Sequence, residues 1–245
     1  MTYREETIGD CRLLLGDCRD ILPTLDLPII TDPPYGIGFR YGVHDDAGGA
    51  AYSELMAALT GPRAILQYPE EMMRYLVPLW GAPDDVFAWC YNSNLPRQMR
   101  LWGFWDCAPV WSRVVQPPKN DVAKVADRPV ASYDWCADIN LVKGNGAEKT
   151  PHPCQIPVTL VERVCRLTGF ASFVDPFLGS GTSGVAAANL GLSFVGVEKD
   201  PEYFDIACHR IDEAYRQPRL FAEPEPKPVQ TDIFAANDEQ TEDAA

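Results

Sequence analysis

The sequence predicts an α/β fold in which strands alternate with helices around a parallel sheet that is covered on both faces. Two observations support this prediction. Short apolar runs typical of buried strands recur along the chain, at 28–31, 63–67, 86–91, 171–175 and 193–197. Between them lie stretches with helical spacing of apolar residues. A chain of 245 residues is long enough to form one such domain.

The first elements are marked by sharp stops. An apolar run at 12–15 ends at Gly16, and a helix is expected from Asp17 to Leu25. The run 28–31 is expected to be a buried strand that ends at Asp32-Pro33-Pro34-Tyr35, because proline has no N–H for a sheet ladder.

Further along the chain the alternation continues. The expected helices are 52–59, 70–79, 95–102, 155–167, 182–190 and 201–215. Between about 103 and 152 the periodicity fades, which predicts an inserted functional segment. Residues 218–245 are rich in proline and acids and are expected to be a disordered tail, so the domain is expected to cover 1–217.

The charge of the chain is uneven. A formal net charge of −14 opposes contact with phosphate groups. Residues 222–245 carry seven acids and one base, whereas residues 97–149 carry eight bases and six acids. The acidity is therefore global and the basic stretch is local, which weakens the case for DNA as a partner without excluding it.

Eight cysteines are scattered through the apolar segments, and none form a C-x-x-C pair. Free thiols are therefore expected, and a metal site is not. No apolar run approaches the roughly 18 residues that span a bilayer, and residues 1–6 lack the layout of a signal peptide. These features predict a cytoplasmic protein with no membrane partner.

A glycine-rich turn follows the apolar run 171–175. Gly179 and Gly181 lack side chains, so a ligand can approach the backbone where a helix N-terminus presents its N–H groups. Glu198 ends the next expected strand, where a carboxylate can accept both hydroxyls of a ribose. Together these features predict a cofactor that contains adenosine.

The segment Asp32-Pro33-Pro34-Tyr35 follows an expected strand, where open α/β sheets place ligands. A proline-stiffened turn with a capping Asp is the plain alternative. The residues also suit methylation of an aromatic amine, whose lone pair is delocalised into its ring. The Asp32 carboxylate and the Pro33 carbonyl could accept its N–H bonds and free that lone pair, while Tyr35 stacks on a flipped base.

With both motifs in view, the chain resembles the DNA amino-methyltransferases, which act on N6 of adenine or N4 of cytosine, from Leu13 to Ile211. Asp32–Tyr35 matches their catalytic motif, and Asp175–Thr182 matches their cofactor motif. The catalytic motif comes first, which is the circularly permuted order of the β class. The resemblance implies a Rossmann-like methyltransferase fold that uses S-adenosylmethionine.

The resemblance also implies residue roles. The catalytic residues would be Asp32, Pro33, Pro34 and Tyr35. The cofactor-binding residues would be Asp17, Cys18, His152, Gln155, Asp175, Phe177, Gly179, Gly181, Thr182 and Glu198. Ile156 departs from the Lys that many relatives have there, at a polar cofactor contact.

The order of the motifs makes residues 103–150 the expected target-recognition region. It is rich in tryptophan and slightly basic, which suits phosphate contacts and base wedging. A folded hydrophobic loop without DNA contacts is the alternative. The segment is short, so sequence specificity is expected to be modest or to depend on a homodimer. Residues 116–120 and 152–157 look most like those of phage or prophage adenine methyltransferases.

The expected activity is transfer of a methyl group to N6 of adenine in double-stranded DNA. Asp32 favours adenine, because relatives specific for cytosine N4 more often carry Ser there; cytosine N4 is the alternative. A DNA-binding relative without activity and a protein-glutamine methyltransferase are further alternatives. A nicotinamide enzyme is disfavoured because Asp175-Pro176-Phe177-Leu178 intervenes before Gly179, and because Asp175 would repel a pyrophosphate.

Overall fold

The computed structural model describes residues 4–39, 46, 48–91, 99–107, 139 and 148–217, with the short strands 124–125, 128–129 and 135–136. Most of the expected recognition region and the whole 218–245 tail lie outside this part of the chain. The disordered tail and the role of the recognition region therefore stay predictions.

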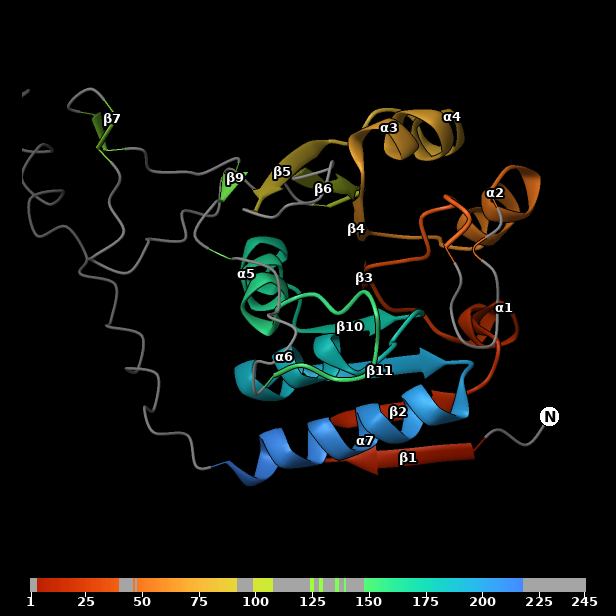
Figure 1. Ribbon diagram of the computed structural model, residues 1–245, viewed down its shortest axis with the longest axis vertical. Helices are drawn as coiled ribbons and strands as arrows, with labels where there is room; N and C mark the ends of the chain where they lie inside the picture. Colours follow the sequence, from red (N-terminus) through yellow and green to blue (C-terminus); the bar gives the residue numbers. More distant parts are fainter. Residues whose placement is uncertain are drawn as a thin grey trace, which may run out of the picture.

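In the described part of the chain, a nine-stranded sheet forms the centre of the fold (Figure 1). Its order is β1-β2-β11-β10-β3-β4-β6-β5-β9. The five strands from β2 to β4 in this order are parallel, whereas β1 and β6 run antiparallel to their neighbours. The strands are β1 (Arg4–Ile8), β2 (Cys11–Leu15), β3 (Ile29–Thr31), β4 (Arg63–Gln67), β5 (Asp85–Cys90), β6 (Met99–Trp105), β9 (Trp135–Cys136), β10 (Ser172–Asp175) and β11 (Ser193–Glu198), with β7 (Lys124–Val125) and β8 (Arg128–Pro129) paired separately.

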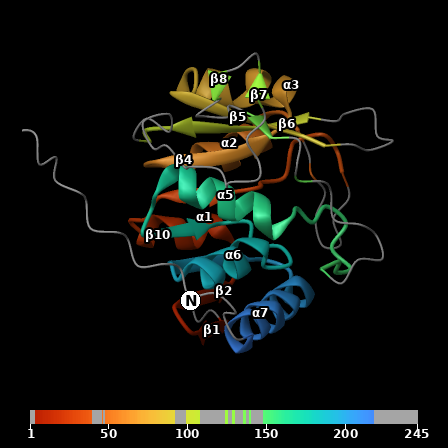
Figure 2. The same ribbon diagram turned by 90° about the vertical axis from the view of Figure 1, so that its left-hand side faces the viewer.

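Helices pack against both faces of this sheet. One face is covered by α5, α6 and α7, which lie one below the other in Figure 2. The other face is covered by α1, α2 and the helical segment that follows β4. The helices are α1 (Cys18–Ile21), η1 (Leu22–Thr24), α2 (Ala50–Ala57), α3 (Pro69–Glu71), η2 (Met72–Leu76), α4 (Val77–Trp80), α5 (Val158–Thr168), α6 (Thr182–Leu190) and α7 (Pro201–Arg216).

The apolar strand residues divide between two cores. Leu13 and Phe173 pack with α5, α6 and α7, whereas their neighbours Leu14 and Val174 pack on the opposite face. Successive side chains of a strand point to opposite faces, so a strand covered on both sides must be apolar throughout. This arrangement confirms the expected α/β fold.

The expected helix at 95–102 is wrong over its described residues. Residues 99–105 form strand β6, which pairs antiparallel with β4 and β5. Trp102 and Phe104 face one core, while Trp105 faces the other. An apolar run that is buried on both sides carries no period-two signal, so helix and strand could not be told apart from the pattern.

Two other elements near the N-terminus differ from expectation. The helix expected from Asp17 to Leu25 ends as α1 at Ile21 and continues as the single 3-10 turn η1. Pro23, which has no N–H to donate, lies in this turn. Strand β1 was not expected, because at the sheet edge its sequence Arg-Glu-Glu-Thr-Ile buries little apolar surface.

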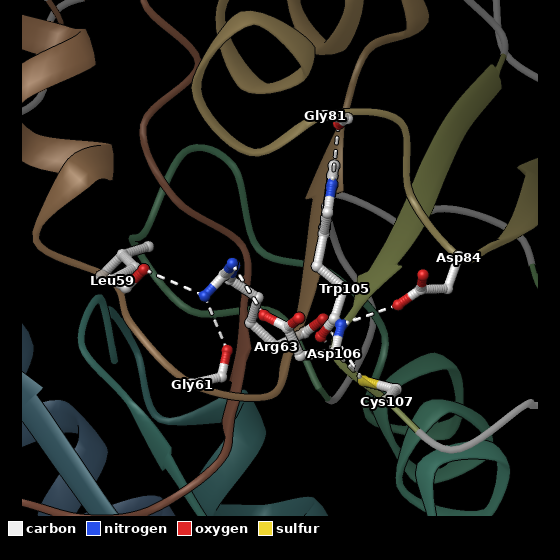
Figure 3. A network of polar contacts seen from close by, with 8 residues as sticks. All are labelled: Leu59, Gly61, Arg63, Gly81, Asp84, Trp105, Asp106 and Cys107. Carbon is white, nitrogen blue, oxygen red and sulfur yellow. Dashed lines mark hydrogen bonds and ion pairs between the residues drawn. The ribbon is translucent and has the colours of Figure 1, made fainter.

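The end of the sheet where β4 begins is held by a buried arginine (Figure 3). Arg63 donates to the carbonyl of Gly61 at 2.6 Å and to the Asp106 carboxylate at 3.0 Å. Its guanidinium carbon also lies 4.5 Å from the centre of the Trp80 ring. These contacts fix β4 against the end of β6, at the edge opposite the carboxyl end of β4.

The remaining expectations concern metals, thiols and membranes. The seven cysteines whose side chains are described are free. Within the described ranges, no cluster of three or more His, Cys, Asp or Glu residues is arranged to hold a metal ion. A search of the same residues finds no helix with the length and apolar character needed to cross a membrane.

Candidate active site

Four predicted site residues lie at the carboxyl ends of the central parallel strands. Parallel strands β2, β3, β10 and β11 all end there, and Asp17, Asp32, Asp175 and Glu198 lie at these ends or within two residues of them. In Figure 1 this is the side toward which the β10 and β11 arrows point. The carboxyl edge of a parallel sheet is where α/β folds bind their ligands.

The two motifs are joined directly through their strands. Val174 of β10 pairs with Ile29 of β3, and the Thr31 hydroxyl donates to the Asp175 carboxylate at 2.5 Å. Asp32 follows Thr31, so the catalytic motif begins one residue beyond the end of β3, which is the neighbour of the strand β10 that carries the cofactor motif. The glycine turn and the Asp-Pro-Pro-Tyr segment thus lie next to each other, as the sequence predicts.

Asp175 itself is 2% exposed and is occupied by donors of its own chain. Its carboxylate accepts the hydroxyls of Thr31 and Ser183 and the backbone N–H of Phe177. Burial raises its pKa, and these hydrogen bonds act against that rise. In this arrangement Asp175 braces β3, β10 and α6, and the cofactor contact that the resemblance implies for it stays a prediction.

Asp32 accepts a hydrogen bond from the Tyr35 hydroxyl, within the same short segment. Burial raises the pKa of Asp32 to about 6, against the attraction of Arg100 and the Tyr35 hydrogen bond, while the charge of Asp175 adds to the rise. Asp32 is therefore a carboxylate at neutral pH that protonates readily just below it.

Tyr35 is 6% exposed, and its ring meets the Tyr68 ring edge-on, with centroids 5.0 Å apart. The Arg100 guanidinium carbon lies 5.2 Å from the centre of the Tyr35 ring. The open stacking face expected for Tyr35 is thus covered in this conformation, and stacking on a base requires the ring to move.

Asp46 is a site residue that sequence reasoning missed. It is buried, and its carboxylate accepts the backbone N–H groups of Tyr35, Gly36 and Ile37 at 2.6–3.2 Å. Three charge-assisted hydrogen bonds hold the turn after the prolines in one shape. The only sequence signal is an aspartate ten residues beyond a proline turn, which predicts nothing alone.

Arg100 is the second residue that was missed. Because β6 runs antiparallel to β4, its second residue returns to the edge where β3 ends. The guanidinium carbon lies 5.2 Å from the ring centre of Tyr68 and 5.6 Å from that of Trp89. The sequence analysis missed this position because it predicted a helix at 95–102, whereas Arg100 lies in strand β6.

The glycine turn is built around Gly179, which adopts a left-handed φ of 54°. Its N–H donates to the Glu198 carboxylate at 2.7 Å, and an added Cβ would lie 3.2 Å from Nε2 of His152. The ring of His152 packs edge-on against Tyr203, and burial lowers its pKa to about 4, so it is neutral at physiological pH. The turn therefore offers backbone, not side chain, beside a neutral imidazole.

Gly181 has a structural reason to be glycine. Its φ is 85°, and an added Cβ would lie 2.8 Å from the Cα of Ala207 in α7. Arg210, also in α7, donates to the carbonyl of Ser180 at 2.6 Å and reaches the Thr182 hydroxyl at 3.4 Å. The turn is thus held from the side of α7, and the expected close approach of a ligand to Gly179 and Gly181 stays a prediction.

Asp17 caps helix α1 through a hydrogen bond from the N–H of Arg19. The Arg19 guanidinium also pairs with its carboxylate, which lowers the pKa of Asp17, and the Lys199 ammonium lies 3.5 Å away. Gly16 donates its N–H to the carbonyl of Glu198 at 2.8 Å, so the ends of β2 and β11 are tied together. Cys18 instead packs in the core beneath α1, where burial raises the pKa of its thiol to about 12.

Two further predicted residues, Gln155 and Thr182, make hydrogen bonds within the protein. The Gln155 amide accepts the N–H of Thr150 at 2.9 Å and donates to the carbonyl of Glu148 at 2.7 Å. The Thr182 hydroxyl reaches the carbonyl of Ile156 at 3.4 Å. Both side chains are buried: Gln155 holds the segment before α5 together, and Thr182 ties that segment to the start of α6.

One family model matches the central and C-terminal part of the chain. Residues 88–209, which are 122 of the 245 residues, match the model of the DNA methylase family N6_N4_Mtase. The matched stretch contains the glycine turn and Glu198, whereas Asp32 precedes it.

Two curated relatives match shorter stretches. The chain is 40% identical over 72 residues to the Type II methyltransferase M.ScaI of Streptomyces caespitosus, covering 29% of this chain and 24% of that one. It is 41% identical over 63 residues to the Type II methyltransferase M2.DpnII of Streptococcus pneumoniae, covering 25% and 24%. The chain spans about a quarter of the length of these relatives in its matches.

Solved structures match over most of the chain. The complex of M1.HpyAVI with SAM has a TM-score of 0.58 at 24% identity, covering 82% of this chain and 99% of that one. The cytosine-N4-specific PvuII DNA methyltransferase has a TM-score of 0.60 at 18% identity, covering 86% and 93%. The fold is thus that of these DNA methyltransferases, and residues 88–209 of the chain match the DNA methylase family N6_N4_Mtase.

Proposed function

We propose that the chain transfers a methyl group from S-adenosylmethionine to N6 of an adenine flipped out of double-stranded DNA. The observation that supports this most is the adjacency of the two motifs. Asp32 and the glycine turn follow neighbouring strands, and the Thr31–Asp175 hydrogen bond joins those strands at the same edge. An amine bound at one motif would therefore lie beside a cofactor bound at the other.

The residues at the edge suit the adenosine end of the cofactor. A carboxylate has about four acceptor positions, and Glu198 uses three of them for the N–H groups of Gly179, Lys199 and Asp200. One position remains at Oε2 for a hydroxyl of the ribose. The partly exposed backbone at Gly179 would lie along the methionine end, and Asp17 would lie near the adenine.

The chain's own groups would activate the amine. S-adenosylmethionine supplies a methyl group whose bonding electron pair stays with sulfur when the amino nitrogen attacks. Asp32 would accept one N–H of that amine in place of the Tyr35 hydroxyl, and the carbonyl of Pro33 would accept the other. The rigid prolines preorganise both acceptors, which draws the nitrogen toward tetrahedral geometry before attack. Asp32 would then take the proton that the methylated nitrogen releases.

Tyr35 would change partner during this cycle. Its hydroxyl now occupies the Asp32 oxygen that the amine requires, so the base must displace it. The freed ring could then lie against the face of the base, as aromatic side chains do in base-flipping enzymes.

The test is transfer of a tritiated methyl group to unmethylated genomic DNA by the full chain. We expect incorporation by the wild type and by the exposed-residue control Asp26→Ala, and none above background by Asp32→Ala. Binding of S-adenosylmethionine by calorimetry should be the same for all three proteins. Equal incorporation by Asp32→Ala refutes its assigned role, and cofactor binding without incorporation by the wild type indicates a non-catalytic relative.

Analysis of the methylated product identifies the target base. Asp32 supports adenine, and hydrolysis of the methylated DNA to nucleosides should yield N6-methyladenine. Recovery of N4-methylcytosine would replace this part of the proposal. Single-molecule sequencing of the same DNA would report the modified base together with its sequence context.

A further inference from the structure

The buried charge of Arg100 takes no part in the chemistry proposed for Asp32 and Tyr35. Arg100 is 8% exposed and stands among aromatic rings from three strand ends. Its guanidinium carbon lies 5.2 Å from the ring centres of Tyr35 and Tyr68, 5.6 Å from that of Trp89 and 5.8 Å from that of Tyr91.

Aromatic faces attract a cation, but burial of a guanidinium without an opposite charge is costly. The carboxylate whose charge acts on Arg100 is that of Asp32. The two residues also share a neighbour, because Tyr35 donates its hydroxyl to Asp32 while its ring lies beside the guanidinium. Arg100 thus contacts the catalytic segment through both the charge of Asp32 and the ring of Tyr35.

We propose that Arg100 is a positioning residue that places its charge near Asp32 and holds the Tyr35 ring beside it, ready for the target amine. The inference rests on the proposed function and deepens it. Arg100 does not touch the reacting atoms in this arrangement; it acts through Asp32 and Tyr35.

The electrostatic part follows from the surroundings of Asp32. Burial raises the pKa of Asp32 to about 6, and the charge of Arg100 is the largest influence that lowers it. Without the charge of Arg100, burial and the repulsion by Asp175 would still raise the pKa of Asp32. Only the hydrogen bond from the Tyr35 hydroxyl would then lower it. Asp32 would then be protonated at neutral pH and would lose an acceptor oxygen. The titratable groups around the pair are Tyr35 of the same segment, Asp175 of β10, Tyr52 of α2, Tyr68 after β4 and Tyr91 after β5.

The geometric part depends on the shape of the guanidinium. Its flat, weakly hydrated face can lie against Tyr35 and Tyr68, whereas a lysine ammonium is compact and strongly hydrated. Arg100→Lys therefore separates the two parts, because it keeps the charge and loses the planar contact.

The first experiment measures kcat at saturating DNA against pH for the wild type, Arg100→Met and Arg100→Lys. Arg100→Met should move the acid limb upward by about one pH unit or more, as expected for the loss of a close opposite charge. Arg100→Lys should leave the limb near its wild-type position while lowering the plateau. Arg74→Met is the matched control, because Arg74 lies 6.0 Å from the Tyr75 ring but is exposed. An unshifted acid limb in a folded, active Arg100→Met variant overturns the proposal.

The second experiment needs no activity and so separates this inference from the proposed function. Urea unfolding midpoints are compared for the wild type, Asp32→Asn, Arg100→Met and the double variant. Arg100→Met should lower the midpoint clearly in the wild-type background and much less in the Asp32→Asn background. Equal losses in both backgrounds overturn the proposal. Should Arg100→Met fail to fold, rescue by Asp32→Asn supports the pairing, and failure in both backgrounds refutes it.

Discussion

The hydroxyl of Thr31 donates a hydrogen bond to the carboxylate of Asp175, 2.5 Å away on the adjacent strand and 144 residues later in the chain. Thr31 is the last residue of β3 and Asp175 is the last residue of β10. The contact therefore fixes the ends of β3 and β10 relative to each other, and with them the start of the segments that carry the two motifs. It also satisfies a carboxylate that is almost fully buried.

Thr31→Val should destabilise the protein through this contact. Removing a donor from a buried carboxylate leaves that charge less well satisfied, at a cost of about 1–3 kcal/mol in the free energy of unfolding. Thr168→Val is the matched control, because the Thr168 hydroxyl is buried too but donates to a neutral carbonyl at 3.1 Å. Urea unfolding measures both. A loss no larger for Thr31→Val than for Thr168→Val contradicts the importance of the contact.

Asp46→Asn should lower turnover while cofactor binding is unchanged. An amide has one acceptor oxygen, so it cannot hold the N–H groups of Tyr35, Gly36 and Ile37 together. Misplacement of the segment by an ångström would reduce kcat by roughly 100-fold. Methyl transfer and calorimetry test this, with the exposed Asp26→Asn as control. Unchanged kcat would show that the turn keeps its shape without Asp46.

Gly181→Ala should cost more stability than Gly61→Ala. Both glycines have positive φ, 85° and 79°, so both variants carry backbone strain of about 1–2 kcal/mol. Only at Gly181 would the new Cβ also meet the backbone of Ala207, at 2.8 Å, whereas nothing lies within 4 Å at Gly61. The difference between the two unfolding free energies isolates the contact with α7. Equal losses would mean that α7 can shift at no cost.

Asp32→Asn should stabilise the fold at neutral pH. The pKa of Asp32 is raised from 3.8 to about 6 on folding, so its ionisation opposes folding; the penalty grows as pH rises from about 4 to about 6 and is constant above that range. Asn removes this penalty, which corresponds to about 1–3 kcal/mol at pH 7.5. Below pH 4 Asp32 becomes protonated in both the folded and the unfolded state, so the stability gained by Asp32→Asn should vanish. Urea unfolding at several pH values measures it; a gain that is the same at every pH contradicts this origin.

Much of the candidate site could be predicted before the structure. The turn residues of Asp32-Pro33-Pro34-Tyr35 and the glycines after Asp175 are local signals, because proline and glycine restrict or free the backbone wherever they occur. The positions of Glu198 and Asp17 after apolar runs also predicted their place at strand ends. These features depend on neighbours within a few residues, so the sequence alone reveals them.

The roles of individual side chains were less accessible. Asp175 was expected to face the cofactor, yet three of the chain's own donors surround it. For Gly181 the expected reason was access for a ligand, and the structure adds a packing reason, because its missing Cβ makes room for α7. Thr31 lies 144 residues from Asp175 in the sequence, and Ala207 belongs to a different helix from Gly181, so no local pattern records either contact.

The sequence by itself determined the alternation of buried strands and helices and the two motifs at their ends, because hydrophobic periodicity and turn chemistry act over short stretches of chain. The tertiary structure decided the antiparallel course of β6, which brings Arg100 to Asp32, and the return of Asp46 to the proline turn. The physical reason is that strand order and direction depend on which apolar faces pair across the sheet. Only that pairing decides which charges meet.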